Sequence, residues 1–166
     1  MIRYATKSDI YDIARIKVSS WKKNYIDILD STYLCNMDID YYCEKYISSF
    51  NKFNYIVYEE NNKILGFCKF NILKKGIYDA EIYSLYVDNK YKRLGIGSKM
   101  FNYVINELKK QGILKVKIWC LKENNIGNSF YVKKGCKLVE IKKDNIDGVN
   151  DVWFNGYIYE LMGGDR

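Results

Sequence analysis

The residues best suited to bind an anion lie in one segment, where a predicted strand ends, a basic loop follows and an amphipathic helix begins. Its sequence is Leu85-Tyr86-Val87-Asp88-Asn89-Lys90-Tyr91-Lys92-Arg93-Leu94-Gly95-Ile96-Gly97-Ser98. Backbone N–H groups point outward at a helix N-terminus, and the helix dipole adds about half a positive charge there. Glycine allows close approach to a ligand, and Lys92 and Arg93 can add charge-assisted hydrogen bonds. The segment therefore predicts a binding site for a phosphate-bearing ligand.

Two common phosphate-binding loops can be tested against these residues. A P-loop requires Gly-Lys-Ser/Thr, whereas the order here is Gly97-Ser98-Lys99. The dinucleotide fingerprint requires a third glycine where this chain has Met100, and no βαβ unit precedes the segment. Both are excluded. A loop whose glycines serve only turn geometry remains the simplest alternative unless a second motif supports the site.

The chain has no histidine, which excludes His-dependent triads, His-based acid–base chemistry and most transition-metal sites. The five cysteines have no C-x-x-C spacing. Cys43, Cys68 and Cys120 lie in apolar periodic segments, so we interpret them as small buried hydrophobes rather than metal ligands or catalytic residues. Acid–base chemistry must then come from Tyr, Glu, Asp, Lys, Cys or water. We expect no metal.

The composition is basic, with 27 Lys and Arg against 20 Asp and Glu and a formal charge of +7. These basic residues are scattered, which does not favour nucleic acid and leaves a phosphate-rich cofactor or an ordinary basic surface. No apolar run approaches the roughly 20 residues that cross a bilayer, and the N-terminus lacks an export signal. We expect a cytoplasmic protein that binds neither nucleic acid nor membrane.

The elements that must position this segment alternate between strands and helices. The residues 6–9 have the form of a helix-capping box, and apolar spacing of three and four residues predicts the helices. Predicted helices cover 10–25, 38–50, 97–111 and 126–134, and predicted strands cover 2–5, 53–59, 64–72, 80–87, 114–121, 136–142 and 152–161. We predict one α/β domain over residues 1–166, with a mixed, mostly antiparallel, twisted central sheet flanked by helices.

The anion-binding segment resembles the acetyl-CoA pyrophosphate loop of the GNAT superfamily of N-acetyltransferases, R/Q-x-x-G-x-G/A, with Lys92, Gly95 and Gly97 at its defined positions. Lys92 keeps the charge of the usual Arg but lacks its planar fork. A second motif, residues 124–136 (NNIGNSFYVKKGC), resembles the family's N-x-x-A-x-x-F-Y-x-K-x-G-F, with Gly127 in place of Ala. Together with a Trp-x-x-x-Tyr stretch at residues 21–25, the resemblance covers essentially the whole chain.

This resemblance implies a GNAT-like fold whose sheet is splayed at the middle strands, with acetyl-CoA bound there. The strand before the loop would pair with the pantetheine arm through the backbone of Leu85, Tyr86 and Val87. Backbone amides would hold the pyrophosphate, and they belong to Arg93, Leu94, Gly95, Ile96, Gly97 and Ser98. Asn124 would hydrogen-bond the pantetheine region, with Asn128 as a weaker companion.

The catalytic groups are also assigned from this resemblance. Tyr131 is the predicted general acid, because a phenol with a pKa near 10 is protonated at neutral pH and can donate to the CoA thiolate. The alternative for Tyr131, one of 17 tyrosines, is a role in the core. Glu81 is the best candidate for the base that deprotonates the amine, and a water relay or a solvated carboxylate is the alternative. Trp21 and Tyr25 are assigned to the acceptor pocket, and a role in closing the core is equally compatible with the sequence.

The sequence therefore predicts an acetyl-CoA-dependent N-acetyltransferase that acts on a primary amine of a small molecule or peptide, by direct transfer in a ternary complex. We expect acetyl-CoA and an amine acceptor as partners, and a monomer or homodimer. Two alternatives remain: a non-catalytic CoA-binding or regulatory domain, and a basic nucleic-acid-binding domain.

Overall fold

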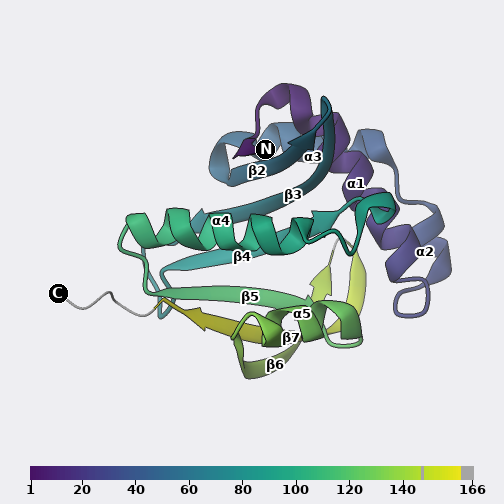
Figure 1. Cartoon of the computed structure of the whole chain (residues 1–166). Helices are drawn as coiled ribbons and strands as arrows, with labels where there is room; N and C mark the ends of the chain where they lie inside the picture. The colour runs from purple at the N-terminus through teal and green to yellow at the C-terminus, as the bar shows by residue number, and fades with distance from the viewer. Residues whose placement is uncertain (147, 162–166) are drawn as a thin grey trace. The chain divides into compact units, whose positions relative to one another are not determined.

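The computed structural model describes residues 1–146 and 148–161. Figure 1 shows its helices and strands. The chain divides into two compact units. The first unit comprises residues 1–71 and 84–106, and the second comprises residues 72–83 and the chain from 107 onward. The expectation of one domain over residues 1–166 stays a prediction, and residues 147 and 162–166 lie outside the described part.

Hydrogen bonds connect seven strands in the order β1-β2-β3-β4-β5-β7-β6. The strands are β1 (Ile2–Tyr4), β2 (Asn54–Glu60), β3 (Lys63–Ile72), β4 (Ala80–Val87), β5 (Lys115–Leu121), β6 (Lys137–Ile146) and β7 (Val149–Glu160). Strand β4 pairs with β5 in parallel, whereas β1–β2, β2–β3, β5–β7 and β6–β7 are antiparallel. The prediction of a mixed, mostly antiparallel sheet with flanking helices is confirmed.

The first unit begins with a capped helix. The Asp9 carboxylate accepts hydrogen bonds from the Thr6 N–H at 2.7 Å and from the Arg3 guanidinium at 2.8 Å. This confirms the predicted capping box, which starts a short 3₁₀ turn and then α1 (Ile10–Asn24). The apolar side of α1 is buried, as its helical spacing predicted.

Two other helices of this unit pack on opposite faces of β3. The Phe67 ring lies 6.3 Å from that of Tyr46 in α3 (Ile39–Ser49). Its neighbour Gly66 faces α4 (Ile96–Lys110), where a Cβ at Gly66 would come within 2.8 Å of Met100 Cε. Because consecutive strand residues point to opposite faces, β3 has α3 on one side and the start of α4 on the other.

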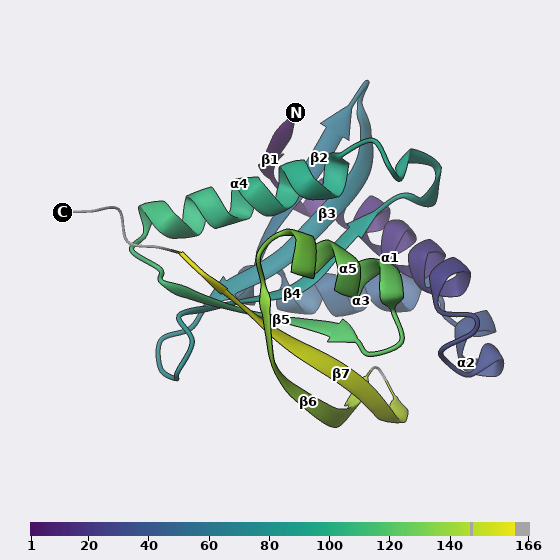
Figure 2. The same ribbon diagram turned by 60° about the horizontal axis from the view of Figure 1, so that its bottom comes forward.

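The second unit is built around β5, which lies between β4 and β7 (Figure 2). Helix α5 (Asn125–Lys133) packs against the face of β5 that carries Cys120. The alternate residues Lys117 and Trp119 point to the opposite face. The two faces of these strands thus have different surroundings: a helix on one and side chains of β4 and β6 on the other.

The predicted elements are found with small shifts at their ends, and two features differ. Helix α2 (Ser31–Cys35) was not predicted, because five residues are too few to show a period; its N-cap Asp30 accepts from the Tyr33 N–H at 2.9 Å. The β6–β7 hairpin is longer than predicted, because polar residues that are typical of a loop pair across it, as Asp144 does with Val152. None of the described helices is long and apolar enough to span a membrane.

Candidate active site

The anion-binding loop of the first unit begins at Asp88, which is buried at the end of β4. Its carboxylate accepts a hydrogen bond from Arg15 at 2.7 Å and another from the Lys90 N–H at 3.0 Å. Burial alone would raise the pKa of Asp88, but the Arg15 guanidinium and the Lys90 amide outweigh it and lower this pKa. Asp88 is therefore ionised near neutral pH and anchors the loop to α1.

A second anchor ties the same loop to the end of α1. Lys92 Nζ donates to Asn24 Oδ1 at 2.6 Å, and Asn24 donates to Asn89 Oδ1 at 3.3 Å. Partial burial and the nearby charges of Lys23 and Arg93 lower the pKa of Lys92. These influences destabilise the ammonium form of Lys92, and a bound anion would stabilise it again. Lys92 therefore suits the position of an anion-binding side chain.

The turn that follows exposes the backbone at the start of α4. Residues 92–95 are exposed, and Arg93 and Gly95 have positive φ angles of 66° and 78°. The first helical hydrogen bond joins Lys99 N–H to the Gly95 carbonyl at 3.0 Å. Amides of Ile96, Gly97 and Ser98 precede it, and helix geometry gives them no carbonyl one turn back. A Cβ at Gly95 would meet no atom within 4 Å, so the space above the turn is open.

These features fit a diphosphate. Outward amides at a helix start, open space at a glycine and two basic side chains are the donors that phosphate oxygens require. Just before the loop, the predicted pantetheine-binding residues Leu85, Tyr86 and Val87 are each partly exposed. The close approach of Gly66 to the Tyr86 carbonyl, 2.9 Å from an added Cβ, brings β3 against this strand end.

The structure brings Trp21 and Tyr86 together. Trp21 Nε1 donates to the Tyr86 hydroxyl at 2.8 Å, and the Trp21 ring packs edge-on against Tyr25 at 5.3 Å. Trp21 is 1% exposed and Tyr25 is buried as well. Lys17 Nζ, also buried, lies 3.4 Å from the centre of the Trp21 ring. Such burial favours the interpretation in which both aromatic residues close the core, and their assignment to the acceptor pocket stays a prediction.

In the second unit, Asn124 caps α5. Its side-chain oxygen accepts from the Gly127 N–H at 3.1 Å. An alanine at position 127, which the family pattern favours, would place its Cβ 2.6 Å from Asn124 Nδ2 and 2.8 Å from Cys120 Sγ. Glycine at this position therefore leaves room for the capping side chain. The predicted contact of Asn124 with pantetheine is not tested by these bonds.

Asn128 has a structural role that the sequence did not indicate. Its amide nitrogen donates to three carbonyl oxygens, and its side-chain oxygen accepts from Asn155 Nδ2 at 3.0 Å and from the Tyr157 hydroxyl at 2.8 Å. The three carbonyls belong to Leu121, Lys122 and Asn124. Asn128 thus joins α5 to β7 and to the end of β5, and its predicted contact with the cofactor stays a prediction.

Tyr131 lies on the same side of these strands. Its side chain is 8% exposed, and its ring packs against Phe130 at 5.3 Å and against Tyr157 at 5.9 Å. The Tyr157 hydroxyl is the group that donates a hydrogen bond to Asn128 Oδ1. The Asn128–Tyr157 pair therefore supports the ring of the predicted general acid.

Glu81 lies on the opposite face of the second unit. It is the register partner of Lys117 on β5, so the two side chains share a face, whereas α5 covers the other. Burial raises the pKa of Glu81, while a hydrogen bond from Tyr83 and the charge of Lys142 act against that rise. The pKa of Tyr83 is raised to about 12 by burial and by the Glu81 charge. A half-buried carboxylate with a raised pKa has the properties of a general base.

Two buried lysines in this structure were not predicted. Lys17 is buried in the first unit and Lys117 in the second. Lys117 follows the alternating polar pattern of its strand, which in sequence alone indicates exposure to solvent. Lys17, by contrast, stands seven residues after Ile10 and four before Trp21, so the helical period places it on the buried side of α1. The nearby aromatic residues Trp21 and Trp119 are a second signal that an ammonium group could be accommodated.

Comparison with known proteins agrees with this geometry. A model of the Acetyltransferase (GNAT) family matches residues 20–136. Spermidine N(1)-acetyltransferase from Thermoplasma acidophilum is 27% identical over 149 residues, which cover 82% of this chain and 88% of that protein. The uncharacterized N-acetyltransferase YuaI of Bacillus subtilis is 26% identical over 125 residues, covering 74% of this chain and 72% of that protein.

Solved structures share the fold. The PaiA N-acetyltransferase from Thermoplasma acidophilum, in complex with coenzyme A, has a TM-score of 0.73 at 21% identity and covers 97% of this chain and 98% of its own. A putative acetyltransferase from Salmonella typhimurium, with acetyl-CoA, has a TM-score of 0.71 at 17% identity and covers 100% of this chain and 96% of its own. Because the family model spans most of the chain, including the anion-binding loop and α5, this protein belongs to the GNAT family of acetyltransferases.

Proposed function

We propose that this protein is an acetyl-CoA-dependent N-acetyltransferase that transfers the acetyl group directly to a primary amine of a small molecule or peptide in a ternary complex. The observation that carries the proposal is the exposed turn at residues 92–95, with outward amides at the start of α4 and open space at Gly95. The relatives named as N-acetyltransferases, and the neighbours solved with coenzyme A or acetyl-CoA, support the same cofactor.

The proposed reaction requires proton transfers at two different atoms, the amine nitrogen and the thiolate sulfur. The amine nitrogen attacks the thioester carbonyl, a C–N bond forms, the C–S bond breaks and the CoA thiolate leaves. An amine with a lysine-like pKa of about 10.4 must lose one proton before it attacks and a second once the C–N bond has formed, and the thiolate must gain one. Glu81 is proposed to accept the first proton, directly or through water. Tyr131 is proposed to donate to the thiolate and to recover its proton from the new amide nitrogen.

The two side chains lie on different faces of the strands in the second unit. Tyr131 lies on the face that α5 covers, and Glu81 lies on the other face with Lys117. Because the attacking nitrogen and the leaving sulfur are bonded to the same carbon in the tetrahedral intermediate, Glu81 is proposed to act through water while Tyr131 donates directly. Burial also raises the pKa of Glu81, which brings its proton affinity closer to that of its substrate.

The acceptor is the least defined part of the proposal. One relative is named as a spermidine N(1)-acetyltransferase, which makes a polyamine worth testing. The formal charge of +7 opposes the approach of a polycation, so a peptide or small molecule with a single amine is the preferred acceptor class. A panel that includes spermidine, a peptide N-terminus and a lysine side chain separates these classes.

The test combines ligand-dependent melting with turnover. Coenzyme A at about a hundred times its Kd should add about 2.7 kcal/mol to the stability and raise the Tm by several degrees. Acetyl-CoA with the acceptor panel should release free thiol. Thermal stabilisation without thiol release for any amine would favour the non-catalytic CoA-binding alternative. Stabilisation by DNA or RNA instead, with affinity that falls steeply with salt, would favour the nucleic-acid-binding alternative.

A further inference from the structure

A buried lysine, paired with an exposed glutamate, lies next to the proposed base. Lys117 of β5 is 2% exposed, and its ammonium group pairs with the Glu140 carboxylate of β6 and lies 3.4 Å from the Tyr78 hydroxyl. In the parallel β4–β5 register, Lys117 is directly opposite Glu81. The Lys117 ammonium is therefore paired with the Glu140 carboxylate and lies on the same face of the strands as the proposed base.

Trp119 connects the ion pair to Glu81. The ammonium groups of Lys117 and Lys142 lie 4.3 Å and 4.2 Å from the centre of the Trp119 ring, within the range of cation–π attraction. Trp119 is two residues beyond Lys117 on β5, so it lies on the same face as Lys117 and Glu81. A hydrogen bond from its side chain is among the influences that lower the pKa of Glu81.

The neighbouring strand β7 is shaped to admit this network. Gly156 is the register partner of both Trp119 and Glu140. A Cβ at Gly156 would come within 2.8 Å of Lys117 Nζ, 2.8 Å of Trp119 Cζ3 and 2.7 Å of Glu140 Cγ. Any larger side chain here would displace the ammonium group or the ring. The space that Lys117 occupies thus depends on a residue of a third strand.

Stability alone is a poor explanation for such an arrangement. Removing the Lys117 ammonium from water costs several kcal/mol, and its attraction to the partly exposed Glu140 carboxylate at best offsets that cost. A pair of apolar residues of similar size would serve the packing as well. The Lys117 ammonium, by contrast, places a fixed positive charge beside the proposed base.

We propose that the Lys117–Glu140 pair, together with Trp119, holds the Glu81 carboxylate in position and sets its charge, so that Lys117 and Glu140 are positioning residues for deprotonation of the acceptor amine. The proposal rests on the proposed function, in which Glu81 is the base. Neither residue takes part in bond making; each acts on Glu81 through charge and through the indole.

The sign of each effect follows from the groups that face Glu81. The facing residues are Tyr83 on β4, Lys117 and Trp119 on β5, Glu140 and Lys142 on β6, and Tyr78 before β4, while β7 contributes Gly156 and Ile158, which do not titrate. Burial raises the pKa of Glu81, and Lys117 is among the groups that lower it. Loss of the Lys117 charge should therefore raise the pKa of Glu81. Neutral Glu140 leaves Lys117 uncompensated and should lower it.

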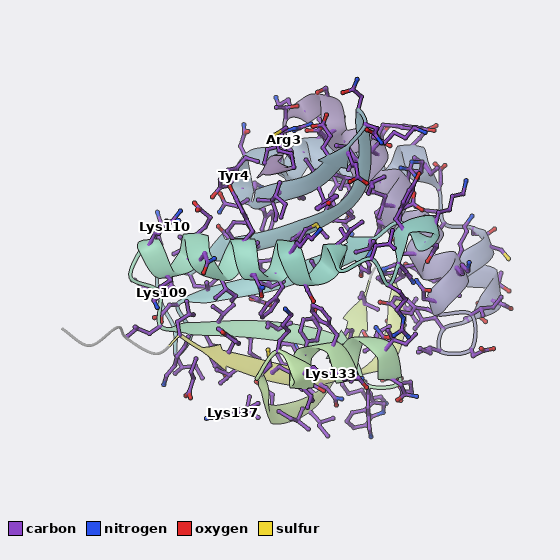
Figure 3. The ribbon with its side chains drawn as sticks, in the orientation of Figure 1. Arg3, Tyr4, Lys109, Lys110, Lys133 and Lys137 are labelled. Carbon is purple, nitrogen blue, oxygen red and sulfur yellow. The ribbon has the colours of Figure 1, made fainter. Side chains whose placement is uncertain are left out.

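The test measures the acid limb of kcat/KM against pH in Lys117→Met and Glu140→Gln. We expect the midpoint to rise in Lys117→Met and to fall in Glu140→Gln, with the double variant close to the parent. Structural damage would move both single variants in the same direction or lower the rate equally at every pH. The matched control is Lys137→Met (Figure 3): Lys137 also lies on β6, is 73% exposed and pairs with Glu160 at 3.1 Å, so its loss should leave the midpoint unchanged.

A second measurement does not depend on turnover. The carboxyl carbon of Glu81, assigned by its loss in Glu81→Gln, can be titrated by NMR in the protein without ligands. Midpoints that move in opposite directions in the two variants support the proposal, and midpoints that stay within about 0.2 unit of the parent overturn it. Midpoints that move without any change in the rate profile overturn the role in deprotonation. Absence of acetyl transfer by the parent protein contradicts the proposed function instead, and the titration still decides the coupling.

Discussion

The two regions that carry the predicted site residues use different chemical groups: backbone amides in the first unit and side chains in the second. In the first unit, the anion-binding loop offers backbone amides at the start of α4, and residues 92–95 are exposed. In the second unit, the chemistry resides in side chains that contact one another, such as Asn128 with Tyr157 and Lys117 with Glu140. A backbone site depends on φ angles and on room, whereas a side-chain site depends on the identity of each partner.

This difference predicts how well each region tolerates amino-acid substitutions. Every residue except proline provides a backbone N–H group. The loop should therefore accept side-chain substitutions that do not alter its turn. Each member of a hydrogen-bonded network leaves its partners unsatisfied when it is removed, which costs more than the bond itself is worth. Substitutions in the second unit should therefore have larger effects than substitutions of side chains in the loop.

The largest effect is expected for Tyr131→Phe. The phenol provides the proton for the departing thiolate in the proposed reaction, and general acid catalysis is typically worth about 10²- to 10⁴-fold. We expect kcat to fall by about that factor while the Kd for coenzyme A stays nearly unchanged. Steady-state kinetics and calorimetry provide the two numbers. An unaltered kcat would remove Tyr131 from the mechanism and weaken the contrast between the two regions.

Next in size is the loss of stability in Asn128→Ala. The variant leaves the Tyr157 hydroxyl and the Asn155 amide without their acceptor. Each unsatisfied buried group costs about 1–3 kcal/mol, and alanine returns a few tenths through helix propensity, so we expect a loss of about 2–4 kcal/mol. Urea unfolding measures it.

A control of the same residue type lies in the same helix. Asn125 is exposed, and Asn125→Ala should change the free energy of unfolding by less than about 0.5 kcal/mol. A loss below 1 kcal/mol in Asn128→Ala would show that the bonds of Asn128 are replaced by water and that its role is not structural.

The smallest effects are expected in the loop, and they separate backbone from side chain. Gly95 has a φ of 78°, so Gly95→Ala strains the turn by about 1 kcal/mol and should weaken coenzyme A binding about fivefold. Lys92 is exposed, and Lys92→Ala should weaken binding only two- to threefold, as expected for one exposed charge. Calorimetric titration of coenzyme A at fixed salt compares them. A larger loss in Lys92→Ala than in Gly95→Ala would mean that the side chain, not the backbone, dominates.

Much of the fold follows from local rules that the sequence carries. The capping box at Thr6 and Asp9, the helical spacing in α1, α3 and α4 and the alternation in the central strands were predicted, and the structure confirms them. The two motifs also led to the GNAT family, which the family model over residues 20–136 shows. Helix α2 was missed because a helix of five residues has no visible period.

The tertiary structure alone decides which polar residues meet. Lys117 shares the alternating polar pattern of exposed Lys115, yet it is buried because β6 and Gly156 of β7 close over it. Trp21 is joined to Tyr86 across 65 residues of sequence. Periodicity reports which face of an element a residue occupies, because the period is a property of the local backbone. What lies opposite that face depends on strand order and register, which join residues far apart in the chain.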